Sequence, residues 1–93
     1  MDVVHVPGTR RGDIFLYTLS TCGWCRKMKD WLNEKGLEYS YVDVDLTPPA
    51  EQDTVMGEVR HWNPQCTFPT VVVNKAQCFS GFKPERLEEI LGS

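Results

Sequence analysis

The chain of 93 residues has little positive charge and no long apolar run. Ten Lys and Arg against 13 Asp and Glu give a net charge of −3, which argues against a basic surface for nucleic acid. No segment approaches the length needed to cross a membrane, and residues 1–12 lack the apolar core of a signal peptide. The sequence therefore predicts a cytoplasmic protein that binds neither nucleic acid nor a membrane.

The spacing of ligands for a metal site is also missing. Zinc sites usually need a second Cys-x-x-Cys or a pair of histidines beside the first Cys-x-x-Cys. Outside the single pair, the candidate ligands are Cys66, Cys78, His5 and His61. We therefore expect no metal site. With 41% apolar residues the chain is one small domain, which can bury a core without structural disulfides.

The most informative feature present is the pair Cys22 and Cys25, which lies between an apolar, β-rich run at residues 14–18 and an amphipathic helical run at 24–32. Cys22 should stand at the helix N-terminus, where unpaired N–H groups and the helix dipole stabilise an anion. Cys25, one turn later, should lie beneath it within reach of a disulfide. The pattern predicts dithiol redox chemistry, with Cys22 as the nucleophile and the more buried Cys25 as the resolving thiol.

The rest of the chain alternates between strand-like and helix-like segments. We expect strands at 14–18, 39–44, 70–73 and 77–80, and helices at 24–35, 47–62 and 84–91. The order β-α-β-α-β-β-α predicts an α/β fold with a four-stranded mixed sheet flanked by three helices. Residues 13–93 form this domain. Residues 1–12 are predicted to be an N-terminal extension, and an added edge strand at 3–6 is the less favoured alternative.

The cysteine pair, this element order and the segment Thr67-Phe68-Pro69-Thr70 before the third strand together resemble the glutaredoxin family of the thioredoxin superfamily. The resemblance implies a thioredoxin-like (glutaredoxin) fold and a cis peptide bond between Phe68 and Pro69; a trans proline in a loop is the other interpretation. Such a turn would present the backbone of Phe68 to an extended substrate, as in strand addition. The resemblance therefore implies that Thr67, Phe68 and Pro69 bind substrate.

Further along, the segment 79–84, Phe-Ser-Gly-Phe-Lys-Pro, is similar to the redoxins of ribonucleotide reductase (NrdH-redoxins), which are glutaredoxin-sized proteins with thioredoxin-like behaviour. Glutaredoxins that use glutathione usually carry Gly-Gly and a small-residue/Asp pair here, and a Lys shortly before the first cysteine. This chain has Phe82-Lys83 and Leu19-Ser20-Thr21 instead. The resemblance thus implies substrate binding by Gly81 and Phe82, a client such as ribonucleotide reductase, and an upstream thiol reductase.

The two residues between the cysteines keep other functions open. An aromatic residue at the second position is a habit of glutaredoxins, and we assign Trp24 to a substrate platform, with core packing as the other interpretation. Gly23 resembles a subset of glutaredoxins in which two chains and two glutathione thiols bridge a [2Fe–2S] cluster. Glutathione-dependent reduction, with Arg26 or Arg60 as the cation, and cluster carriage are the alternatives to a monomeric, cofactor-free dithiol reductase.

Several residues carry weaker expectations. Cys66 stands two positions before Phe68, so in an extended segment both side chains would lie on the side of the redox pair. An accessory thiol and a buried structural cysteine are the two hypotheses for Cys66, whereas Cys78 is expected in the core. His5 is expected in the N-terminal tail and His61 on a helix surface.

Basic residues gather near the cysteines in the sequence. They are Arg10, Arg11, Arg26, Lys27 and Lys29. If they lie on the active-site side, they would favour a thiolate or an acidic protein partner. An ordinary solvated helix face is the other interpretation of the lysines.

Overall fold

The computed structural model describes residues 3–92 of the chain. Its elements are β1 (Val4–Val6), β2 (Ile14–Thr18), α1 (Gly23–Glu34), β3 (Tyr39–Asp43), the 3-10 turn η1 (Val44–Leu46), α2 (Pro49–Trp62), β4 (Thr70–Val73), β5 (Gln77–Ser80) and α3 (Pro84–Gly92). From β2 onward the predicted order β-α-β-α-β-β-α is confirmed. No helix in this described part is both long and apolar enough to span a membrane.

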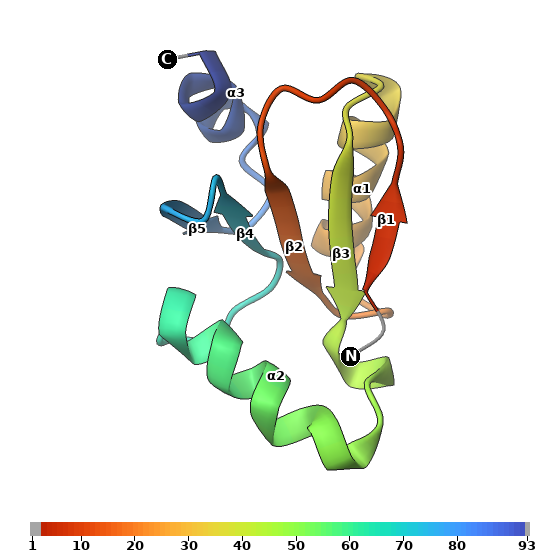
Figure 1. The fold of residues 1–93 in the computed structure, drawn as a ribbon, viewed down its shortest axis with the longest axis vertical. Helices are drawn as coiled ribbons and strands as arrows, with labels where there is room; N and C mark the ends of the chain where they lie inside the picture. The colour runs from red at the N-terminus through yellow and green to blue at the C-terminus, as the bar shows by residue number, and fades with distance from the viewer. Residues whose placement is uncertain (1–2, 93) are drawn as a thin grey trace.

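The sheet has the strand order β1-β3-β2-β4-β5. Strands β2 and β3 are parallel, as expected for a β-α-β unit, and β4 and β5 form an antiparallel hairpin (Figure 1). The predicted count of four strands is wrong, because Val4–Val6 pairs antiparallel with Tyr39–Tyr41 and adds a fifth strand. Three valines in four residues favour a strand, and pairing covers the edge that β3 would otherwise expose.

A close backbone crossing holds this extra strand in place. A Cβ on Gly8 would lie 2.6 Å from the carbonyl oxygen of Gly36, so only glycine fits there. The crossing is closed by two hydrogen bonds, from Thr9 N–H to the Gly36 carbonyl at 2.8 Å and from Glu38 N–H to the Thr9 carbonyl at 2.9 Å. The segment predicted as an extension is therefore integrated into the sheet.

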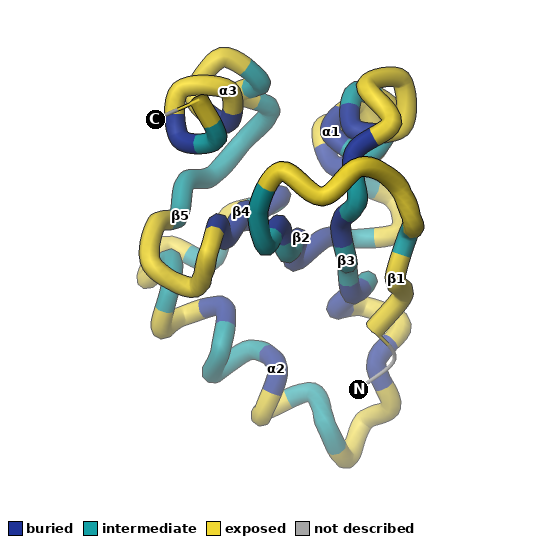
Figure 2. The backbone as a smooth tube through the Cα atoms, turned by 45° about the horizontal axis from the view of Figure 1, so that its top comes forward, coloured by how far each residue is buried: buried dark blue, intermediate teal, exposed yellow. Residues whose placement is uncertain are grey.

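Each face of the sheet carries its own core. One cluster lies under α1 and α3 and contains Ile14, Leu16, Met28, Leu32, Leu37, Tyr39, Val71, Val73, Leu87 and Ile90. The other lies under α2 and contains Tyr17, Val42, Val44, Val55, Val59 and Val72. Neighbouring residues of one strand, such as Leu16 and Tyr17, enter opposite clusters because side chains alternate along a strand. Figure 2 shows the buried central strands beside the exposed β1.

Helix α1 is positioned by this core. Cys25, Met28 and Leu32 are buried at helical spacing on its inner face. The helix ends at Glu34 with Lys35 as its C-cap, and the predicted glycine, Gly36, follows with a φ of +65°, a left-handed conformation that closes many helices. Because α1 follows β2 directly, its N-terminus and Cys22 lie at the carboxyl edge of the sheet.

Candidate active site

The two cysteines occupy the two predicted positions. Cys22 is the N-cap of α1, with extended backbone, and its Sγ accepts a hydrogen bond from the Cys25 N–H at 3.3 Å. Cys22 is half-buried, whereas Cys25 is 0% exposed. Both are free thiols. The arrangement offers one sulfur to a substrate and keeps the other beneath it.

The environments of the two sulfurs differ in a way that affects protonation. Burial, followed by the interaction with Cys22, raises the pKa of Cys25 to about 12, although the charge of Lys29 acts in the opposite direction. At neutral pH the reduced protein therefore holds Cys25 as an uncharged thiol. Of the two cysteines of the pair, only Cys22 is partly exposed.

The loop that leads into Cys22 is held by a carboxylate. Asp45 accepts the backbone N–H of Ser20 at 2.8 Å, and its second oxygen accepts the Ser20 hydroxyl. These hydrogen bonds lower the pKa of Asp45. Asp45 was missed from the sequence, but a signal exists: it follows β3, whose carboxyl end lies beside that of β2 because the two strands are parallel.

A second polar group lies where β2 and β3 end. Thr18 Oγ1 lies 2.6 Å from Asp43 Oδ1 and 3.1 Å from the Val42 carbonyl oxygen. Lys29 Nζ lies 3.1 Å from the same Asp43 oxygen and 3.9 Å from the centre of the Tyr41 ring. The Lys29 side chain is 20% exposed, so the solvated-face interpretation is wrong for this lysine.

Two of the predicted substrate residues form an aromatic pair, in which Trp24 is exposed and Phe82 is partly buried against the core. The Trp24 and Phe82 rings stack with centroids 6.3 Å apart and an interplanar angle of 23°. Trp24 is 58% exposed, so the core-packing interpretation of this residue is wrong. Lys27 Nζ lies 4.8 Å from the Trp24 ring centre. We call Trp24 and Phe82 the aromatic platform.

The other predicted substrate residues belong to two adjoining loops. The Phe68–Pro69 peptide bond is cis, so the trans interpretation of Pro69 is wrong. The Gly81 N–H donates to the Pro69 carbonyl at 2.9 Å, and the hydroxyls of Thr67 and Ser80 are hydrogen bonded. Residues 67–69 are thereby linked to residues 80–82, the segment that carries Phe82.

The remaining cysteines lie elsewhere. Cys66 has a φ of +53° and its N–H donates to the Asn63 carbonyl at 2.8 Å. The extended segment assumed for Cys66 is therefore wrong, because residues 63–66 form a turn. The half-buried side chain packs against the cluster under α2. Cys78 packs against the same cluster, half-buried, and its Sγ donates to the Trp62 carbonyl at 2.9 Å.

The histidines are far from forming a ligand set. His5 lies in β1 rather than in a tail, and its Nε2 is 3.3 Å from Glu38 Oε2. His61 is exposed on α2 with its ring edge-on to Trp62. Among residues 3–92, no three His, Cys, Asp or Glu side chains gather so that they could hold a metal ion.

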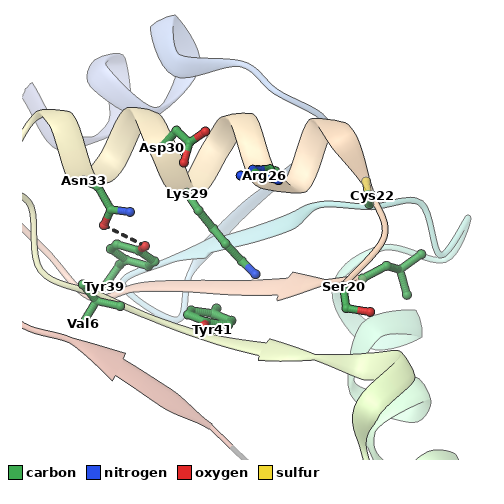
Figure 3. Close-up of a pocket in the computed structure, with 10 residues that line it drawn as sticks. Val6, Ser20, Cys22, Arg26, Lys29, Asp30, Asn33, Tyr39 and Tyr41 are labelled. Carbon is green, nitrogen blue, oxygen red and sulfur yellow. Dashed lines mark hydrogen bonds between the residues drawn. The ribbon is translucent and has the colours of Figure 1, made fainter.

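A groove of about 450 Å³ opens on the other side of Cys22. Figure 3 shows Cys22 at one end, with Arg26, Lys29, Asp30 and Asn33 projecting from α1 above a floor of Tyr39, Tyr41 and Val6. The Tyr39 hydroxyl donates to Asn33 Oδ1 at 3.0 Å. None of the predicted substrate residues lines this groove; Cys22 and Arg26, a candidate cation of the glutathione-dependent alternative, do. Sequence reasoning missed it because β1 and β3 complete it only through sheet pairing.

Known proteins share this fold and this sequence pattern. The glutaredoxin of Methanosarcina mazei is 39% identical, with 100% of this chain and 90% of that chain covered and a TM-score of 0.88. Methanoredoxin of Methanosarcina acetivorans is 40% identical over 92% of this chain and 90% of that chain, with a TM-score of 0.86. A glutaredoxin-like 8.6 kDa protein in the rubredoxin operon of Clostridium pasteurianum is 24% identical over 84% of this chain and 96% of its own length.

The match extends to the level of a family. The family model described as Glutaredoxin matches residues 14–77, which include β2, the cysteine pair and the cis-proline loop. The matched region accounts for well over half of the chain. With its thioredoxin-like sheet and its cysteine pair at the start of α1, the chain belongs to the glutaredoxin family of redox proteins.

Proposed function

We propose that this protein is a thiol-disulfide oxidoreductase that reduces protein disulfides by a dithiol mechanism. The observation that carries the proposal is the asymmetry of the cysteine pair. Cys22 Sγ caps α1 and accepts the Cys25 N–H at 3.3 Å, while Cys25 is completely buried. A thiolate at a helix N-terminus is stabilised as an anion and is the attacking species in disulfide exchange.

The reaction has two exchange steps. The Cys22 thiolate attacks one sulfur of the client disulfide, the client S–S bond breaks, and the departing client thiolate takes a proton from solvent. The Cys25 thiol then gives up its proton and attacks Cys22 Sγ, so that the mixed disulfide breaks and the second client thiol leaves. Two electrons pass to the client, and the protein retains a Cys22–Cys25 disulfide for an upstream reductase to reduce.

Ribonucleotide reductase or a similar protein is the proposed client. The aromatic platform supports a protein client, because the exposed Trp24 ring, stacked on the partly buried Phe82 ring, supplies apolar contact area near the cysteine pair. The cis-proline loop supports it further, because residues 67–69 are linked to the segment that carries Phe82. We propose no cofactor besides the dithiol, a monomeric state, and a cytoplasmic location where free cysteines persist.

Serine variants of the two cysteines test the proposal. With reduced protein and a disulfide-bonded protein substrate, we expect Cys22→Ser to abolish reduction, because no thiol remains at the helix end. Cys25→Ser should still attack and accumulate a mixed disulfide at Cys22, detected by mass spectrometry after acid quench. Cys66→Ser is the matched control and should retain wild-type turnover. Wild-type turnover in Cys22→Ser would contradict the assignment.

The same assay identifies the reductant. Recycling of the wild-type protein is followed with thioredoxin reductase in one arm and with glutathione plus glutathione reductase in the other. We expect recycling by thioredoxin reductase, because Phe82 and Lys83 stand where a glutathione-using protein would carry an aspartate. Recycling by glutathione alone would instead favour the glutathione-dependent alternative.

A further inference from the structure

Cys22 forms one end of the polar groove between α1 and β3, and the groove is long enough for a peptide. Its α1 wall runs from Cys22 to Asn33, which corresponds to about 16 Å at the rise of an α-helix. An extended peptide of about five residues covers that length. The volume of about 450 Å³ lies within the usual range of ligand sites. A client chain joined to Cys22 thus has a path away from the sulfur.

The end of the groove nearest Cys22 carries a cation without an anionic partner. Arg26 lies one turn after Cys22 on the same helix face, is exposed, and makes no ion pair among residues 3–92. Lys29, also in the groove wall, is already paired with Asp43. Arg26 is therefore the side chain that remains available to bind a carboxylate.

The nearby carboxylates do not neutralise Arg26. Asp43 is engaged by Lys29 and Thr18, and Asp45 is engaged by both donors of Ser20. Asp30 lines the groove one turn beyond Arg26, farther from Cys22. The groove is thus cationic beside the sulfur and acidic farther along, which suits a ligand whose negative group lies next to its cysteine.

From this geometry we infer that the groove between α1 and β3 binds an extended client peptide with an acidic residue adjacent to its disulfide cysteine, and that Arg26 binds that carboxylate. The inference rests on the proposed function, since it specifies which protein disulfides the dithiol reduces. It adds a specificity site distinct from the aromatic platform and from the cis-proline loop.

Matched peptide disulfides test the inference. Symmetric disulfides of Gly-Asp-Cys-Asp-Gly and of Gly-Asn-Cys-Asn-Gly, blocked at both ends, differ only in charge beside the sulfur. The second-order rate of Cys22–Cys25 oxidation is measured by acid quench, alkylation and mass spectrometry. We expect the wild-type protein to react about three- to tenfold faster with the Asp peptide relative to the Asn peptide at low salt. High salt should reduce this preference.

Variants of Arg26 separate binding from the intrinsic reactivity of the peptides. Arg26→Glu should abolish or reverse the Asp preference, Arg26→Lys should retain most of it, and the control Lys35→Glu should leave it unchanged. The Lys35→Glu substitution makes the same change of charge, but at the far end of α1. There the Lys35 Nζ lies 5.7 Å from the centre of the Trp31 ring. An unchanged Asp preference in Arg26→Glu would overturn the inference.

A small acid distinguishes a peptide site from a simple charge effect. The small acid is 3,3′-dithiodipropionate. If Arg26→Glu lowers the rate with this acid by the same factor as the rate with the Asp peptide, the groove responds to charge alone and the assignment to a peptide is wrong. We expect a smaller effect on the small acid, because it does not occupy the length of the groove. Failure of the proposed function looks different: neither peptide would oxidise the Cys22–Cys25 pair.

Discussion

Cys22 lies between two unlike surfaces. On one side lies the apolar aromatic platform of exposed Trp24 and partly buried Phe82, and on the other the groove along α1 carries the cation Arg26. Apolar contact area contributes affinity with little regard to the charge of the partner. A cation instead discriminates between partners and loses its effect in salt. A single reactive sulfur between two such surfaces can combine general attraction for protein surfaces with selection of particular sequences.

The largest effect that we expect concerns the thiol buried beneath both surfaces. Because burial raises the pKa of Cys25 to about 12, the unfolded thiol ionises first as pH rises. The contribution of Cys25 to stability is thus complete below about pH 8.5 and is lost between there and pH 12. The reduced protein should lose about 2 kcal/mol through Cys25 by about pH 10.

Denaturant unfolding in a reducing buffer measures this effect. The wild-type protein is compared with Cys25→Ala between about pH 7 and pH 10. The tyrosines with raised pKa values, Tyr17 and Tyr39, are present in both proteins, so their contributions cancel in the difference. Parallel pH profiles for the two proteins would show that Cys25 is not held as a neutral thiol.

The next effect separates the two surfaces directly. Trp24→Ala should lower kcat/KM for a protein disulfide by about tenfold, because a hot-spot aromatic contributes on the order of 1–2 kcal/mol to an interface. The Asp preference among peptides should stay unchanged, because Trp24 does not line the groove. The neutral small substrate hydroxyethyl disulfide serves as the control. An equal loss with this small substrate would show that Trp24 acts on the cysteine pair and not on the client.

A smaller effect should reach both surfaces at once. Asp45→Asn weakens the hydrogen bonds to Ser20, so Cys22 should become less well positioned. The rates of disulfide reduction should fall about threefold for protein and peptide substrates alike. Asp53→Asn, an exposed change of the same charge on α2, is the control. If the rate falls for only one class of substrate, Asp45 acts on the platform or on the groove alone and does not position the loop before Cys22.

The part of the site that was predictable from sequence is the part encoded by local patterns. A cysteine after a strand and before an amphipathic run predicts an N-cap, and Cys22 is one. Helical spacing predicts that Cys25 faces inward, and it is buried. The cis bond at Pro69 followed from the family resemblance rather than from any local pattern, and the stacking of Phe82 on Trp24 was not predicted.

The part that was missed depends on pairing between distant segments. In the sequence nothing distinguishes Lys29 from a surface lysine. In the structure β3 places Asp43 and Tyr41 against its side chain. In the sequence Asp45 looks like an ordinary loop residue. In the structure β3 lies parallel to β2, and Asp45 is therefore placed beside Ser20. Cys66 was misplaced for a similar reason, because a turn with positive φ interrupts the segment assumed to be extended.

The floor of the groove includes a residue of β1, which is distant in sequence from the cysteine pair. The family match begins at residue 14, whereas Val6 of β1 contributes to the floor of the groove from outside the matched region. An N-terminal segment can vary without altering the cysteines, the cis-proline loop or the aromatic platform. A substitution at Val6 can therefore change the floor of the groove while the sequence of the cysteine pair and of the cis-proline loop stays the same.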